Sequence, residues 1–127
     1  MALVARTRRP TDAELNILRV LWSRGPSTVR EVAQALERES AYTTILKLLQ
    51  IMATKGLVRR DESARTHVYH AACSEHETQR KLVTDLLMRV FDGSAAQLVM
   101  QALAVGRTSP EELTEIRKLL TRHRGGR

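Results

Sequence analysis

The segment between residues 41 and 60 combines hydroxyl, amide and basic side chains and contains no carboxylate. Thr43, Lys47, Gln50 and Thr54 recur at helical spacing, which places them on one face of a helix. Hydroxyls and amides can contact base edges in the major groove of DNA, and a lysine can reach guanine or a phosphate. An ordinary solvent-exposed helix face mixes both charge signs. The pattern therefore favours a DNA-reading helix, whose predicted contact residues on this face include Thr43, Lys47 and Gln50.

Basic side chains that follow this segment fit a second task, contact with the DNA backbone. Arg59, Arg60, Arg65 and His67 flank a polar turn, and Arg65 stands nearest its tip. Phosphate contacts fix the position of a protein on DNA but read no sequence. For each residue, a solvated strand position is the alternative. We also predict a phosphate contact for Thr28, at the start of an earlier helix.

His70, Cys73 and His76 stand three residues apart and could offer metal ligands. A closed zinc site needs a fourth ligand, so separate surface and packing roles are favoured over metal sensing, and over a redox role for Cys73. A single cysteine cannot form an internal disulfide. The sequence contains no glycine-rich phosphate loop, no His-Glu-x-x-His motif and no nucleophile elbow. We therefore expect no metal, no cofactor and no enzymatic activity.

Three short helices are predicted to position the basic segment. Thr11 and Glu14 can form a capping box for the first helix, and Gly25-Pro26 ends it. A second box at residues 28–31 begins the next helix, which charged residues 37–40 close. The third helix runs from about residue 41 to residue 55 and stops at Gly56. Its buried face is predicted from apolar residues at i, i+3, i+4 and i+7, namely Ile45, Leu48, Leu49 and Met52.

Two strands follow the third helix, at residues 57–60 and 65–70, and residues 61–64 are predicted to join them in a tight hairpin. Three helices followed by a two-stranded wing is the winged helix-turn-helix arrangement, in which the third helix enters the major groove. The predicted fold is thus mainly α with a small β-hairpin: a winged helix-turn-helix domain followed by C-terminal dimerisation helices.

The rest of the chain is predicted to be helical, with apolar stripes interrupted at residues 92–94 and 106–108. These stripes are wider than a lone helical appendage could bury, and such patches normally mark an interface. A homodimer is therefore expected, although the helices could instead fold back on the N-terminal domain. The predicted dimerisation residues are Leu82, Leu86, Val90, Leu98, Leu103, Leu113, Ile116 and Leu120.

The charge of the chain is concentrated in its N-terminal part. The formal net charge is +7, and residues 1–73 hold a net +5. We predict a flexible basic arm at residues 1–10, a DNA-binding domain at 11–73, a helical dimerisation region at 74–123 and a basic tail at 124–127. A generic basic surface is the alternative. No apolar stretch approaches the ~18 residues of a membrane span, so we expect a soluble, cytoplasmic protein without a membrane partner.

Several segments resemble the penicillinase-repressor (BlaI/MecI) family of winged-helix regulators. The resemblance covers about residues 11–122, and its most specific motif is the Ala-Tyr-Thr-Thr-Ile sequence at residues 41–45. It extends to Leu49 and to the Lys-Gly-Leu-Val sequence at residues 55–58. Similar segments lie at residues 14–22, 28–32 and 65–69.

This resemblance implies a homodimeric repressor that binds a palindromic operator and controls β-lactamase or other stress-response genes. It places Tyr42, Thr43, Thr44 and Lys47 against DNA. Many members are inactivated when a regulatory protease system cleaves the C-terminal segment, at a position that corresponds to Gln101-Ala102. The family's cleaved pair is Asn-Phe, whereas this chain has Gln-Ala at that position. The difference argues against induction by the family's usual proteolytic cleavage.

Two other functions stay open on the sequence alone. A winged-helix protein-interaction module would bind DNA weakly and without sequence preference. A non-specific DNA-binding protein would coat DNA without sequence preference. The absence of carboxylates from residues 41–60 favours DNA over a protein partner.

Overall fold

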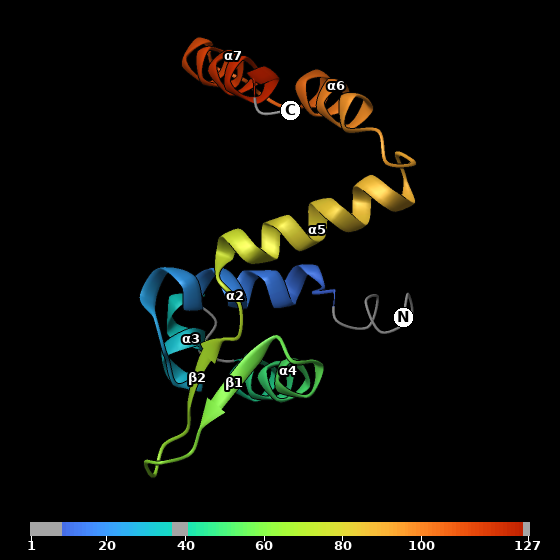
Figure 1. Cartoon of the computed structure of the whole chain (residues 1–127). Coiled ribbons are helices and arrows are strands. Elements are labelled where there is room, and N and C mark those ends of the chain that lie inside the picture. Colours follow the sequence, from blue (N-terminus) through green and yellow to red (C-terminus); the bar gives the residue numbers. More distant parts are fainter. Residues whose placement is uncertain (1–8, 37–40, 126–127) are drawn as a thin grey trace. The chain divides into compact units, whose positions relative to one another are not determined.

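The computed structural model describes residues 9–36 and 41–125, which form six helices and one two-stranded hairpin (Figure 1). This confirms the predicted mainly helical fold with a winged helix-turn-helix order of elements. Residues 1–8 of the predicted arm, residues 37–40 and the side chains of residues 124–127 lie outside what is described. The element bounds are α2 Asp12–Arg24, α3 Val29–Ala35, α4 Tyr42–Lys55, β1 Val58–Asp61, β2 Val68–Ala71, α5 Glu75–Arg89, α6 Ala95–Val105 and α7 Pro110–Gly125.

Both predicted capping boxes are present at the starts of α2 and α3. Thr11 Oγ1 accepts from the Glu14 backbone N–H (3.2 Å), and the Thr11 N–H donates to Glu14 Oε1 (2.9 Å). Thr28 and Glu31 repeat the same exchange at 3.1 and 2.9 Å. These bonds satisfy backbone donors that the first helical turn leaves unpaired. Gly25 ends α2 at φ 91° and ψ −168°, a conformation open essentially to glycine alone.

The hydrophobic core lies in the N-terminal unit, where α2, α3 and α4 pack with the hairpin. It is almost wholly aliphatic, as the low aromatic content predicts, and Tyr69 from β2 is its one fully buried aromatic ring among the described residues. The fully buried aliphatic side chains come from three helices, with Ile17 and Leu18 from α2, Val32 from α3, and Leu49 and Met52 from α4. The core therefore fixes α4 against the other two helices.

The hairpin differs from the predicted tight turn. Strand β1 pairs antiparallel with β2, from Val58 opposite Ala71 to Asp61 opposite Val68, so residues 62–67 form a longer loop and the second strand begins at Val68. Tight two-residue hairpin turns need a residue with positive φ, usually glycine or asparagine. The loop has neither residue type, and none of its residues has positive φ. A two-way backbone bridge between Ser27 and Tyr69 (2.9 and 2.8 Å) joins the hairpin to the segment before α3.

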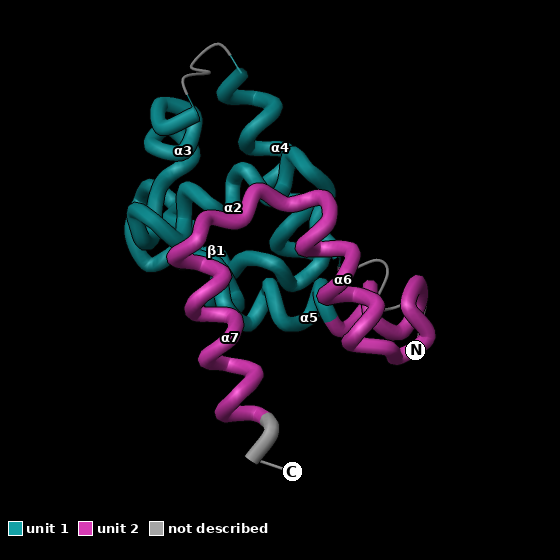
Figure 2. The backbone as a smooth tube through the Cα atoms, turned by 90° about the horizontal axis from the view of Figure 1, so that it is seen from above, with its two compact units in different colours: residues 1–83 teal, residues 84–127 magenta. Residues whose placement is uncertain are grey.

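The chain divides into two compact units, residues 1–83 and residues 84–127 (Figure 2). The predicted functional boundary between residues 73 and 74 stays a prediction. Ser74, Ser94 and Ser109 cap α5, α6 and α7, each accepting a backbone N–H three residues ahead. None of the described helices is both long and apolar enough to cross a membrane.

Candidate nucleic-acid interface

The helix α4 separates an apolar face from a polar one. Ile45, Leu49 and Met52 are buried in the core, whereas Leu48, which was predicted to share that face, is only partly buried. The polar face is open to solvent and has no acidic side chain. Every residue predicted to contact DNA from this helix is exposed, namely Tyr42, Thr43, Thr44, Lys47 and Gln50. Their contact with DNA stays a prediction, but their positions make it possible.

The end of α4 is fixed by the backbone as well as by packing. Gly56 takes the left-handed conformation (φ 83°, ψ 13°), which glycine adopts without steric cost. The next N–H, of Leu57, donates to the Met52 carbonyl (2.8 Å). This turn leads α4 directly into the wing, so the helix and the hairpin are held next to each other.

An ion pair that sequence reasoning missed joins the start of α2 to the end of α4. Lys55 Nζ donates to Glu14 Oε1 at 2.8 Å, and the two side chains are 20% and 3% exposed. The same Glu14 oxygen accepts the Thr11 N–H of the capping box. The sequence shows Glu14 only as a capping residue and Lys55 only as a cation in the last turn of α4. Their contact spans 41 residues, so no local spacing signals it.

The two neighbouring arginines of β1 point to opposite sides of the hairpin, because successive side chains of a strand alternate. Arg60 lies opposite Tyr69, on the face that also carries buried Val58, and it forms an ion pair with Glu62. A hydrogen bond with the Tyr69 side chain, and then the charge of Glu62, raise the pKa of Arg60 above its ordinary value. Arg59 lies opposite His70 on the other face. The predicted phosphate contact suits Arg59 better, because Arg60 already has partners.

The wing loop carries Arg65 and His67, and both side chains are exposed. No acidic side chain in the described part of the chain forms an ion pair with Arg65. At the start of the loop, the Ser63 backbone N–H donates to Asp61 Oδ1 (2.9 Å) and lowers the pKa of the Asp61 carboxyl below its ordinary value. This bond orders the turn that presents Arg65. The position of Arg65 is compatible with the predicted phosphate contact, which remains untested.

Thr28 is partly exposed at the start of α3. Its hydroxyl oxygen accepts the Glu31 N–H, which leaves the hydroxyl hydrogen available as a donor. A phosphate contact from this side chain is therefore compatible with its capping role.

His70, Cys73 and His76 lie in three different parts of the chain. His70 lies within β2, whereas Cys73 lies in the connection to α5, where its carbonyl accepts the Trp22 indole N–H (2.9 Å) and its sulfur accepts from Lys81 Nζ (3.2 Å). His76 lies on α5, with its Nε2 3.1 Å from an Arg80 nitrogen. No cluster of three or more potential metal ligands occurs among the residues that the structure describes.

The C-terminal helices present apolar side chains to solvent. No described residue of α5, α6 or α7 is buried. Of the predicted dimerisation residues, Leu82, Leu98 and Ile116 are partly buried, whereas the other five are exposed: Leu86, Val90, Leu103, Leu113 and Leu120. Gln101 and Ala102, at the position of the predicted cleavage, are exposed within the continuous helix α6. A protease that cleaved this bond would first have to unwind α6, because proteases bind extended backbone.

Comparison with known proteins supports the resemblance. Residues 10–122 match the penicillinase repressor family. The chain is 32% identical to the transcriptional regulator BlaI of Mycobacterium tuberculosis over 126 residues, which cover 97% of this chain and 91% of the relative. It is 26% identical to the penicillinase repressor of Bacillus licheniformis over 116 residues (90% and 91%). It is 18% identical to the methicillin resistance regulatory protein MecI of Staphylococcus aureus over 119 residues (92% and 97%). The chain therefore belongs to the penicillinase repressor family of DNA-binding transcriptional regulators.

Proposed function

We propose that the chain is a sequence-specific repressor that binds a palindromic operator as a homodimer. The observation that carries this proposal is the solvent-exposed face of α4, which holds hydroxyl, amide and lysine side chains without a carboxylate. DNA repels carboxylates, whereas a protein partner would accept a mixture of charges. The face fits the major groove, which admits one helix.

The side chains of this face divide by the chemistry they can perform. Thr43, Thr44 and Gln50 can hydrogen-bond base edges, and a threonine methyl can contact the methyl group of thymine. Lys47 can donate to guanine or to a phosphate. Arg59, Arg65, His67 and Thr28, from the wing and from the start of α3, would hold the backbone on either side without reading sequence.

The homodimer is supported by the exposed apolar side chains of the C-terminal helices. Val90, Leu119 and Leu120 are 65%, 55% and 61% exposed, although each belongs to an apolar helix stripe. Removing apolar surface from water stabilises a protein by roughly 25 cal/mol per Å2. Packing these stripes against the same stripes of a second copy would therefore stabilise a dimer. A twofold dimer requires an operator with the same symmetry and with half-site centres one DNA turn, or a multiple of it, apart.

The names of the relatives suggest the type of gene that is controlled. One relative is named a penicillinase repressor and another a methicillin resistance regulatory protein. We therefore infer control of a β-lactamase or another stress-response gene. Gln101-Ala102 differs from the Asn-Phe pair that the family resemblance leads us to expect, so we infer that any regulatory protease recognises a different sequence here.

The proposal is tested by titrating the protein onto a labelled duplex with a family-type dyad and onto a scrambled duplex, at several salt concentrations. We expect an affinity ratio of about a thousand or more and a steep salt dependence, at roughly −0.9 in the log–log slope per phosphate contact. Equal affinities would indicate non-specific DNA binding. No binding at low salt would indicate a protein-interaction module.

Matched lysine variants show whether α4 carries the interaction. Lys47→Ala should weaken binding to the dyad. Lys118→Ala removes the same charge from α7, where Lys118 is 59% exposed and lies near Glu115, and should leave binding unchanged. Equal losses for the two variants would mean that net charge, rather than the α4 face, determines affinity.

A further inference from the structure

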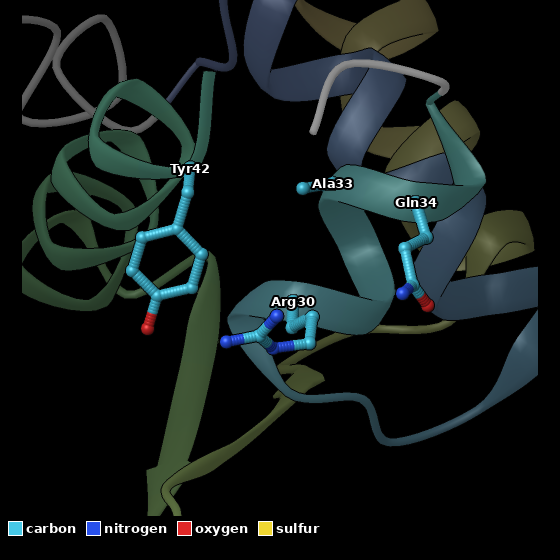
Figure 3. A pocket seen from close by; sticks show the side chains of 4 residues that line it. All are labelled: Arg30, Ala33, Gln34 and Tyr42. Atoms are coloured by element: carbon cyan, nitrogen blue, oxygen red, sulfur yellow. The ribbon is translucent and has the colours of Figure 1, made fainter. Parts of the chain in front are cut away.

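A small surface notch opens between α3 and α4, beside the proposed DNA-reading face. Its volume is about 280 Å3, and it is lined by Arg30, Ala33, Gln34 and Tyr42. Figure 3 shows the Arg30 side chain from α3 and the Tyr42 ring from α4 on opposite sides of the opening, with the Arg30 guanidinium directed toward the side where Tyr42 lies. The small side chain of Ala33, which is 2% exposed, leaves the space between them open.

The notch is rich in hydrogen-bond donors, and Arg30 is the charged residue among those that line it in the described part of the chain. Arg30 is exposed and forms no ion pair with an acidic side chain in the described ranges 9–36 and 41–125. Its neighbour Glu31 is already engaged, because it caps α3 through Thr28 and lies 3.8 Å from Arg24. Tyr42 contributes a phenolic hydroxyl at the start of α4, whose first turn has no acidic residue.

These features suit a phosphate group. An arginine guanidinium binds phosphate through two parallel N–H donors, and the neutral hydroxyl of tyrosine can donate a third hydrogen bond. The 14-residue helix α4 also directs the positive end of its dipole toward the Tyr42 end of the notch. The notch adjoins exposed Thr43 and Thr44 along the chain, so an anion bound there would lie next to DNA held by α4.

We propose that the notch binds one phosphodiester of the DNA backbone, with Arg30 as its principal ligand and Tyr42 as a second donor. The proposal rests on the proposed DNA-binding function and adds a site to it. It assigns Tyr42 to the backbone rather than to a base, and it gives Arg30 a role that its sequence context does not signal. Each half-site of a dimer would use one notch, so two symmetric phosphates would be bound.

The test compares wild-type protein, Arg30→Ala, Arg30→Lys and Tyr42→Phe on the dyad and scrambled duplexes across a salt series. Arg30→Ala should lower affinity for both duplexes by the same factor, and should reduce the salt slope by about 0.9 for each protomer. Arg30→Lys should recover much of the slope, because the charge is kept, but less of the affinity, because the paired donors are lost. Tyr42→Phe should weaken binding without changing the slope.

The matched control is Arg19→Ala, which removes an exposed arginine of α2 that does not line the notch and hydrogen-bonds Asn16 (3.3 Å). It should leave the slope near that of wild type. Thermal unfolding should show that Arg30→Ala folds normally, because its side chain is exposed and has no described ion-pair partner.

A modified duplex locates the phosphate directly. Neutral methylphosphonate groups are introduced one position at a time, and one symmetric pair of positions should weaken wild-type binding but leave Arg30→Ala unaffected. An unchanged slope for Arg30→Ala, an equal effect of Arg19→Ala, or a loss confined to the dyad duplex would each refute the notch while leaving the repressor proposal intact. If the wild-type protein bound no DNA at all, both proposals would fall.

Discussion

Replacement of Lys55 by methionine should clearly lower the stability of the N-terminal unit. The substitution leaves the carboxylate of Glu14 3% exposed, with one remaining hydrogen bond from the Thr11 N–H. Breaking a buried ion pair by removing one partner typically costs about 3–5 kcal/mol. Because Lys55 is 20% exposed and the site is partly solvated, we expect the lower end of that range.

The substitution Glu14→Gln, which removes the other charge of the ion pair, should lower the free energy of unfolding by less. Glutamine keeps an acceptor for the Thr11 N–H, and the flexible stem of Lys55 can carry its ammonium group to water. Loss of one charge-assisted hydrogen bond predicts a cost of roughly 1.5 kcal/mol. The double variant removes both charges, so its loss of stability should be well below the sum of the single losses, with a coupling of about 2 kcal/mol.

Urea unfolding followed by far-ultraviolet circular dichroism would measure these differences at one fixed protein concentration, because dimerisation would otherwise shift the apparent stability. Ile51→Met on the same helix is a suitable control, since Ile51 is 42% exposed. If Lys55→Met lay within about 0.5 kcal/mol of wild type, the value usual for surface changes, or if the two single losses simply added, the ion pair would not hold α2 and α4 together.

Three further changes test other parts of the structure. Thr44→Ala should reduce the ratio of dyad to scrambled affinity in the duplex titration; an equal loss on both duplexes would argue against base reading by Thr44. Leu120 is 61% exposed in the single chain, and Leu120→Glu should convert dimers to monomers in sedimentation equilibrium without lowering the helix content. The control Gln97→Glu, at another exposed position, should leave the dimer intact. The pKa of Asp61 is lowered by the Ser63 N–H, so its contribution to wing stability is present at neutral pH and is lost as the pH falls through the lowered value. Ser63→Pro removes that donor and should raise the pKa toward its ordinary value in an NMR titration; an identical pKa would exclude the bond.

Local signals predicted the elements of the fold well because their causes are local. Thr11 and Glu14, three residues apart, form the capping box that their types predict, and Gly56 takes the left-handed turn that ends α4. The prediction of a tight hairpin turn was wrong because a run of polar residues does not specify the length of the loop that it forms. The register is set by pairing Val58 with Ala71, while Tyr69 lies buried on that same face of the hairpin.

The candidate interface was predictable where exposure follows from helical periodicity. Once Ile45, Leu49 and Met52 occupy the core, Lys47 and Gln50 must face outward. Contacts between distant segments were not predictable. The Glu14–Lys55 pair, the Arg30–Tyr42 notch and the engagement of Arg60 with Tyr69 each depend on how separate elements pack.

Selection of binding sites from a pool of random duplexes tests the central claim most directly, because it presupposes no operator. The wild-type protein should enrich a single motif with twofold symmetry, and its half-site centres should lie about 10–10.5 base pairs apart or at a multiple of that spacing. Recovery of no motif, or of an asymmetric one, would contradict a dimeric repressor that reads DNA with the exposed face of α4.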